Sequence, residues 1–187
     1  MVDRDRAKLH PLMRAAAEAL DAAIAAARLP FQLYEGYRDP ARQAMLYSHG
    51  RVPGMGPAGH YATRARAWES FHNYGLACDY AVLGSDGRWV WPPANDPRWD
   101  EFQALAQSCG LHHLSFERPH VEIPCSLHAL AAGSWPPGDD SWAANMCGII
   151  AAWGDAARQM GGLFNPGAPP WNGPFACDLS RPPMGEP

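Results

Sequence analysis

The sequence contains no long apolar run and no excess of positive charge. No stretch of about eighteen apolar residues is present, which argues against a membrane-spanning helix. The formal net charge is −4, so the chain offers no electrostatic footprint for nucleic acid or for an anionic membrane surface. We therefore expect neither nucleic acid nor a membrane span to be part of its function.

Cysteine pairing is also missing from the sequence. The five cysteines are odd in number and form no Cys-x-x-Cys pair, so they indicate neither a zinc ribbon nor a closed disulfide framework. We expect free, mostly buried thiols. The cysteines are Cys78, Cys109, Cys125, Cys147 and Cys177.

Proline and glycine, by contrast, are abundant, at 19 and 18 among 187 residues, and indicate long loops. Apolar residues at helical spacing predict an amphipathic helix over about residues 7–28, with Pro11 marking its first turn. Residues 31–37 alternate between apolar and polar and predict a strand that ends at Arg38. Asp39, followed by proline, caps a second helix that runs to about residue 49.

The middle of the chain alternates between strands and loops. Residues 50–63 form a glycine- and proline-rich loop, of a length that is commonly functional. An apolar run over 76–83 predicts a buried strand, and a turn leads from it into a second strand at 89–91. A helix is predicted from the Asp96-Pro97 pair to about Cys109, and another short strand at 120–123.

Residues 126–187 have a different composition. Helical patterns over 127–132 and 140–160 precede a segment, 164–187, that is rich in proline, glycine and tryptophan. We favour a helical extension packed on a domain of residues 1–125. The alternative is a surface-binding or partner-binding element that uses Trp135, Trp142, Trp171 and Phe175.

The chemically most informative stretch runs from Ser70 to Asp79. His72 and Asp79 lie seven residues apart around a glycine, and Glu117 precedes His120 at the spacing Glu-x-x-His. Catalytic zinc takes about three nitrogen and oxygen ligands and leaves a fourth position for water. The pattern therefore predicts a zinc site on His72, Asp79 and His120.

Each of these residues has a simpler interpretation. A histidine is more often an ordinary surface or core residue than a ligand, and Asp79 could bond amides at a strand end. A lone carboxylate inside the apolar run 76–83 is costly, however, unless it is paired or metal-bound. Glu117, beside Pro119, could be a plain loop acid, but the strand predicted from His120 onward argues against that.

The pattern Ser-x-His-x-x-Gly-x-Ala-x-Asp, followed by Glu-x-x-His, resembles the zinc D-alanyl-D-alanine carboxypeptidase and L-alanyl-D-glutamate endopeptidase family of cell-wall enzymes. Their fold is shared with the hedgehog signalling domain. The segment from Gly36 to Arg38, with Gln43, is similar to the family's arginine segment. Residues 53–63 are similar to the loop before the first ligand, so the resemblance covers about residues 30–124.

This resemblance implies an α+β fold with a small antiparallel sheet flanked by helices, and one zinc ion per chain. It implies that Glu117 is the general base and that Arg38 contacts a substrate carbonyl or carboxylate. The chain departs from many relatives at residues 110–115, where two histidines replace a Trp-Gly-Gly-like segment. Adjacent side chains on extended backbone point in opposite directions, so at most one of these histidines would face the metal. The predicted substrate-binding residues are Ser70, Arg38, Gln43 and His113.

The resemblance predicts a zinc-dependent peptidoglycan hydrolase that acts on stem peptides. Residues 71–77 resemble the lysin members most closely, which favours an L-alanyl-D-glutamate endopeptidase. The alternatives are a D-alanyl-D-alanine carboxypeptidase and a zinc-bearing wall-binding module without turnover.

The amino terminus bears on how such an enzyme would reach its substrate. Residues 1–6 are charged, and no apolar core with a small-residue cleavage site follows, so the pattern is not that of a secretory signal. An enzyme of the cell wall or periplasm would then arrive as a phage lysin, or as a secreted effector with an immunity or delivery partner.

Overall fold

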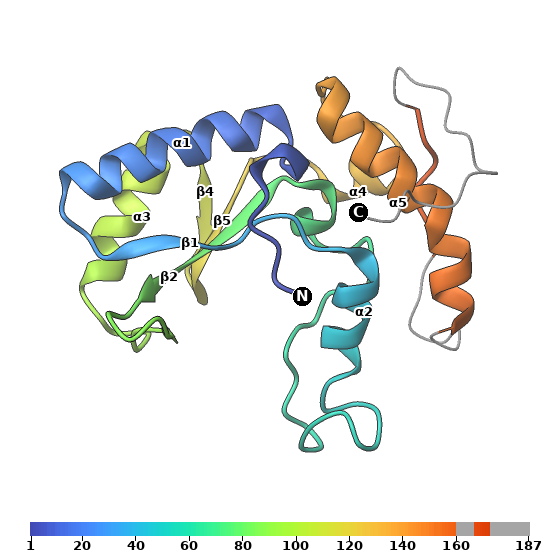
Figure 1. Cartoon of the computed structure of the whole chain (residues 1–187), viewed down its shortest axis with the longest axis horizontal. Helices are drawn as coiled ribbons and strands as arrows, with labels where there is room; N and C mark the ends of the chain where they lie inside the picture. The colour runs from blue at the N-terminus through green and yellow to red at the C-terminus, as the bar shows by residue number, and fades with distance from the viewer. Residues whose placement is uncertain (160–166, 173–187) are drawn as a thin grey trace. The chain divides into compact units, whose positions relative to one another are not determined.

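The computed structural model describes residues 1–159 and 167–172 (Figure 1). It combines helices with one antiparallel sheet, which confirms the predicted α+β class. The chain divides into two compact units. One consists of Val2–Tyr37 and Gly75–Cys125, and the other is built mainly from Arg38–Tyr74 and the described residues from Ser126 onward. In the part of the chain that is described, no helix has the length and hydropathy to cross a membrane.

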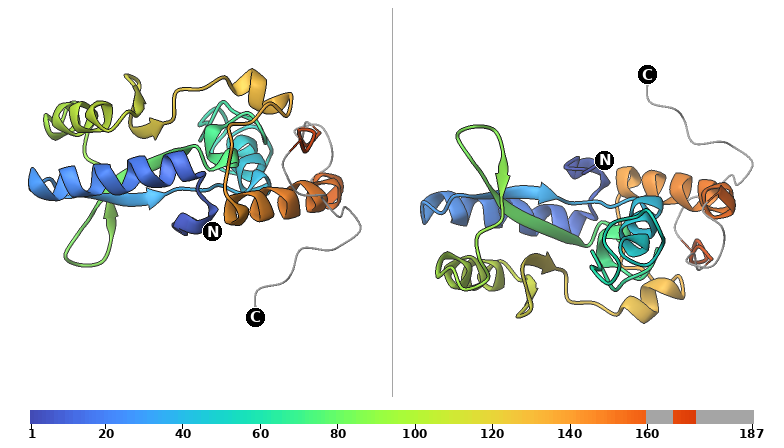
Figure 2. Two further views of the ribbon diagram at one scale, coloured as in Figure 1. Left: turned by 90° about the horizontal axis from the view of Figure 1, so that it is seen from above. Right: turned by 90° about the horizontal axis from the view of Figure 1, so that it is seen from below.

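The first unit contains the whole sheet. Its strands are β1 (Phe31–Glu35), β2 (Ala77–Leu83), β3 (Trp89–Val90), β4 (His112–Leu114) and β5 (Glu117–Glu122). Their order is β1-β2-β5-β4, with β3 also paired to β2, and all pairs are antiparallel. The segment that joins β2 to α3 and contains β3 projects from the sheet as a long loop (Figure 2). Four of these strands match the predictions, whereas β4 was not predicted.

Two helices, α1 (Pro11–Ala26) and α3 (Arg98–Ser108), cover one face of this sheet (Figure 1). Alternate strand residues turn towards them, because successive side chains in a strand point to opposite faces. Cys78 and Tyr80 of β2 and Val121 of β5 face the helices and are buried in a shared core. The intervening residues, among them the paired Asp79 and His120, lie on the other face. The helical side chains in the core are Met13, Ala17, Leu20, Ile24, Trp99, Phe102 and Ala106.

The helix starts follow local signals. Pro11 occupies the first turn of α1, and Nδ1 of His10 accepts a hydrogen bond from the Leu12 amide at 3.2 Å. The expectation for Pro11 is thus confirmed. Helix α3 begins one residue later than predicted, but Asp96 still accepts from the Arg98 amide at 3.0 Å. A side-chain cap of this kind satisfies an amide that has no partner within the helix.

The second unit contains helix α2 (Pro40–Ser48), the 3-10 turn η2 (Phe71–Tyr74), and helices α4 (Leu127–Ala131) and α5 (Asp140–Gln159). Asp39 caps α2 by accepting from the Ala41 amide at 2.7 Å, as predicted. The predicted glycine- and proline-rich loop contains no helix or strand.

An aromatic cluster in this unit surrounds Tyr74, the last residue of η2. The indole N–H of Trp142 on α5 donates to the Tyr74 carbonyl at 2.8 Å, and Trp135 meets the Tyr74 ring edge-on at 5.7 Å between centroids. Trp68 lies 5.9 Å from the same ring. Trp142 is only 2% exposed, so it is not available for a wall-binding role. Phe175, proposed for the same role, lies outside the described residues.

Replacing Trp142 with phenylalanine should destabilise this unit. The change removes the donor from the Tyr74 carbonyl while keeping an aromatic ring, and a buried polar group without a partner costs about 1–3 kcal/mol. The free energy of unfolding, measured in urea, should fall by that amount. Trp91→Phe is the control, because Trp91 is 46% exposed, and it should change stability by less than about 0.5 kcal/mol. Equal unfolding midpoints for the two variants would contradict the role of Trp142.

The expectation of free, mostly buried cysteines is wrong in two respects. Cys147 is disulfide-bonded rather than free. Cys78, Cys109 and Cys125 are free, and Cys125 is exposed rather than buried. Burial strongly raises the pKa of the Cys78 thiol, which suits a packing role on β2 rather than a nucleophile.

Candidate metal centre

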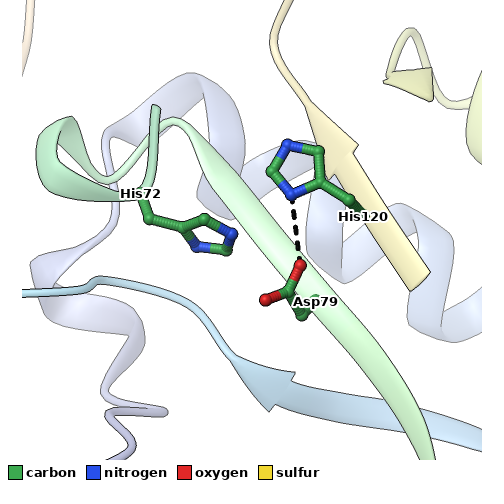
Figure 3. Close-up of side chains that lie close together, drawn as sticks. All are labelled: His72, Asp79 and His120. Carbon is green, nitrogen blue, oxygen red and sulfur yellow. Dashed lines mark hydrogen bonds and ion pairs between the residues drawn. The ribbon is translucent and has the colours of Figure 1, made fainter. Parts of the chain in front are cut away.

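Three buried side chains form a compact cluster. His72, Asp79 and His120 each offer one ligand atom, and these atoms all lie within 4.8 Å of one another. Figure 3 shows the three side chains converging, with a ring nitrogen of His120 directed at the Asp79 carboxylate. Nδ1 of His120 lies 3.1 Å from Oδ1 of Asp79. The residues predicted as ligands are thus brought together.

The sheet register explains why Asp79 and His120 meet. They are direct partners across the antiparallel pair of β2 and β5, so their side chains lie on the same face and a few ångströms apart. Their neighbours Cys78 and Val121 form the next pair and face the helices. Residues 41 positions apart in sequence therefore become neighbours through strand pairing.

Gly75 shapes the bend between η2, which carries His72, and the strand that carries Asp79. Its φ is +66°, in the left-handed region, and a Cβ there would lie 2.6 Å from the Lys8 carbonyl oxygen. Both the conformation and the close approach favour glycine. The glycine of the motif is therefore required by backbone geometry.

The segment that carries His72 also holds the backbone of Arg38. The Arg38 amide donates to the His72 carbonyl at 3.0 Å, and the side-chain amide of Asn73 donates to the Arg38 carbonyl at 2.8 Å. Asn73 is fully buried and also accepts from the Trp68 amide at 2.9 Å. Asn73 was assigned no role from the sequence, although its place next to His72 within the motif is the signal that could have identified it.

Three of the predicted substrate-binding residues, Arg38, Gln43 and Ser70, have backbone or side-chain partners in this unit. Nη1 of Arg38 donates to Oε1 of Gln43 at 3.1 Å, and Nε2 of Gln43 donates to the Ala65 carbonyl at 2.8 Å. Gln43 is fully buried, so its amide links the guanidinium to the loop. Ser70 is half-buried, and its carbonyl accepts from the Asn73 amide. The substrate-binding roles of these residues remain predictions.

A fourth buried side chain, Glu122, was missed. Its Oε2 lies 3.0 Å from Nε2 of His120, and its Oε1 lies 3.3 Å from Nδ1 of His112. Glu122 follows His120 by two residues on β5, and such residues share a face of a strand. A His-x-Glu pair in a predicted strand is the signal that could have found it.

These contacts place opposing influences on the pKa of His120. Burial alone would lower the pKa, but hydrogen bonds with Asp79 and Glu122 and the charges of Asp79 and Glu117 raise it to about 10. Without a metal ion, the neighbouring carboxylates favour the protonated form of the imidazole. A divalent cation would replace that positive charge and release the proton.

Glu117 is the exposed first residue of β5. Regular alternation would put it on the opposite face from His120. The pairing of β4 with β5 is irregular here, however, because it passes from Val121 directly to Glu117. Pro119 lies in this interval and has no amide to donate. The charge of Glu117 contributes, after the hydrogen bonds with Asp79 and Glu122, to raising the pKa of His120.

The two adjacent histidines on β4 have separate environments. His112 contacts Glu122, whereas Nε2 of His113 lies 3.0 Å from the Gln107 side chain on α3. The two rings nevertheless lie 6.4 Å apart between centroids at an interplanar angle of 21°, so the expected divergence of neighbouring side chains is only partial. His113 was predicted to bind substrate, and this role remains a prediction.

No family model matches the chain. The chain is 36% identical over 108 residues to the peptidoglycan L-alanyl-D-glutamate endopeptidase CwlK of Bacillus subtilis strain 168. The aligned region covers 54% of this chain and 62% of that protein, so the chain spans less than two thirds of the relative's length. This similarity supports the family that the Ser70 to Asp79 motif resembles.

Proposed function

We propose that the chain is a zinc-dependent peptidase that hydrolyses peptidoglycan stem peptides between L-alanine and D-glutamate. The observation that carries the proposal is the buried cluster of His72, Asp79 and His120, with Glu117 three residues before His120. The similarity to a peptidoglycan L-alanyl-D-glutamate endopeptidase supports the choice of substrate.

The donor set fits zinc. Two imidazoles and one carboxylate are typical of catalytic sites, in which a fourth position stays open. Ligand atoms about 2.0–2.2 Å from a tetrahedral ion would lie roughly 3.4 Å from one another. The 3.1 Å separation between His120 and Asp79 is close to that value, and the cluster as a whole lies within 4.8 Å.

Different residues of the chain would have separate roles in peptide hydrolysis. Bound zinc supplies Lewis acidity, which polarises a carbonyl and lowers the pKa of water towards neutrality. Glu117 would take the proton of the attacking water and pass it to the departing amine. The Arg38 guanidinium, held by Gln43, would stabilise negative charge on the carbonyl oxygen or bind a substrate carboxylate.

Two alternatives differ in the expected product. A D-alanyl-D-alanine carboxypeptidase would release a terminal D-alanine, and a binding module would release nothing. The presence of Glu117 argues against the binding module, because a non-catalytic site has no need of a base.

Digestion of a tripeptide stem that lacks D-alanine should separate these functions. An endopeptidase should release free L-alanine or a new D-glutamate amino terminus, which mass spectrometry would identify. Removing the metal with a chelator should abolish the reaction, and added zinc should restore it. Cleavage only of stems that end in D-alanyl-D-alanine would favour the carboxypeptidase. Stoichiometric zinc without cleavage of either stem would favour the binding module.

The same proposal places the site of action at the cell wall. Residues 1–125 would form the peptidase domain, and residues 126–187 would form an extension. The described part of this extension contributes aromatic contacts to Tyr74. An immunity or delivery partner remains a prediction without support from the chain.

A further inference from the structure

Glu122 is a buried carboxylate outside the predicted ligand set. We propose that it is a positioning residue that fixes the His120 ring so that Nδ1 faces the metal, and that His112 holds Glu122 in turn. This inference rests on the proposed function only in taking His120 as a metal ligand.

Both ring nitrogens of His120 have a carboxylate partner. Nδ1 lies 3.1 Å from Asp79, and Nε2 lies 3.0 Å from Glu122. A histidine that binds a metal through one nitrogen commonly donates the N–H of the other to a carboxylate, which fixes the tautomer and the ring orientation. Asp79 belongs to the ligand cluster and Glu122 does not. Nδ1 is therefore the metal-facing atom, and the Nε2–H is donated to Glu122.

The sheet register creates the space for this arrangement. Glu122 lies opposite Ala77 on β2 and opposite His112 on β4. The small Ala77 side chain leaves room for the carboxylate on the face that carries Asp79 and His120. The side chain of Glu122 is only 11% exposed, whereas the side chain of His112 is 55% exposed to solvent. Pairing of β4 with β5 thus places His112 beside Glu122, and Glu122 shares a face of β5 with His120.

A buried carboxylate would be costly without partners. Glu122 has a partner for each of its two carboxylate oxygens. Each oxygen is committed to one imidazole. This geometry leaves the carboxylate no role in binding substrate directly and gives it a role in orienting a ligand.

Metal binding tests the proposal without any substrate. Zinc affinity would be measured by competition with a chromophoric chelator, and site geometry by the visible absorption of the Co²⁺-substituted protein. Glu122→Ala should weaken zinc affinity by about 10–100-fold and change the Co²⁺ spectrum. Glu122→Gln keeps an oxygen acceptor for Nε2–H and should retain most of the affinity. Glu122→Asp moves the carboxylate away from Nε2 by the length of one methylene and should weaken zinc binding. If the alanine variant does not fold, the aspartate variant tests the positioning role in its place.

Val121→Ala is the matched control. Val121 is the buried neighbour of Glu122 on β5, but it faces the helices. Its truncation should lower the melting temperature and leave zinc affinity and the Co²⁺ spectrum unchanged. Unchanged affinity in both Glu122→Ala and Glu122→Asp, or an equal loss in Val121→Ala, would overturn the proposal. Since the readout is metal binding, an absence of peptidase activity would refute the proposed function and leave this inference standing.

Discussion

Glu117→Gln is expected to keep one zinc ion per chain and to lose most of its turnover. Glutamine has nearly the shape of glutamate, but its amide cannot accept the proton of the attacking water. General base catalysis contributes about 10²–10⁴-fold, so kcat should fall by that factor. Glu117 is exposed at the start of β5, so the exchange should leave the fold intact.

The measurement pairs zinc content with kcat on purified peptidoglycan fragments. Glu101→Gln serves as the control, because Glu101 is an exposed acid in the first turn of α3. It should retain full turnover. Normal turnover in Glu117→Gln would exclude Glu117 as the base, and loss of zinc from that variant would point instead to a role as a ligand.

The sequence was most informative where local signals decide structure. Asp39 and Pro11 mark helix starts through contacts within a few residues, and both were predicted. The apolar run that forms β2 was also predicted, because its burial is continuous. Strand β4 was missed, since three residues that begin with two histidines show no apolar alternation.

The ligands of the metal cluster could be predicted from the sequence, whereas a residue that contacts them could not. His72, Asp79 and His120 were selected by residue type and spacing, and the structure brings them together. Glu122 was missed because its partners depend on register. His112 lies ten positions away and becomes its neighbour only through the pairing of β4 with β5.

The sequence also could not predict which polar side chains are buried, or which distant segments pack into one compact unit. Gln43 was predicted to bind substrate, but no local pattern shows that its side chain is fully buried and bonded to the Ala65 carbonyl. The proposed boundary at residue 125 divides the chain linearly. The compact units instead group Arg38–Tyr74 with the residues from Ser126 onward. Such a grouping follows from tertiary contacts, so the linear division remains a prediction about function.

His72→Ala is expected to lose both zinc and activity. His72 is 2% exposed and lies in the cluster with Asp79 and His120, so its removal leaves two protein ligands where a catalytic zinc site needs about three. Zinc affinity should fall by more than the loss of about 10–100-fold that is expected when a residue that only orients a ligand is removed. Hydrolysis of stem peptides should become undetectable at zinc concentrations that saturate the unmodified protein.

His60→Ala provides the comparison, because His60 is an exposed loop histidine outside the cluster. It should retain both zinc and activity. Circular dichroism of His72→Ala without metal should match that of the unmodified apo protein, which would separate the loss of a ligand from the loss of the fold. Full zinc content together with full activity in His72→Ala would refute the metal site. Glu117→Gln should lose turnover but keep zinc, whereas His72→Ala should lose both zinc and turnover. The two variants together would therefore assign the general base and the metal ligand to different residues.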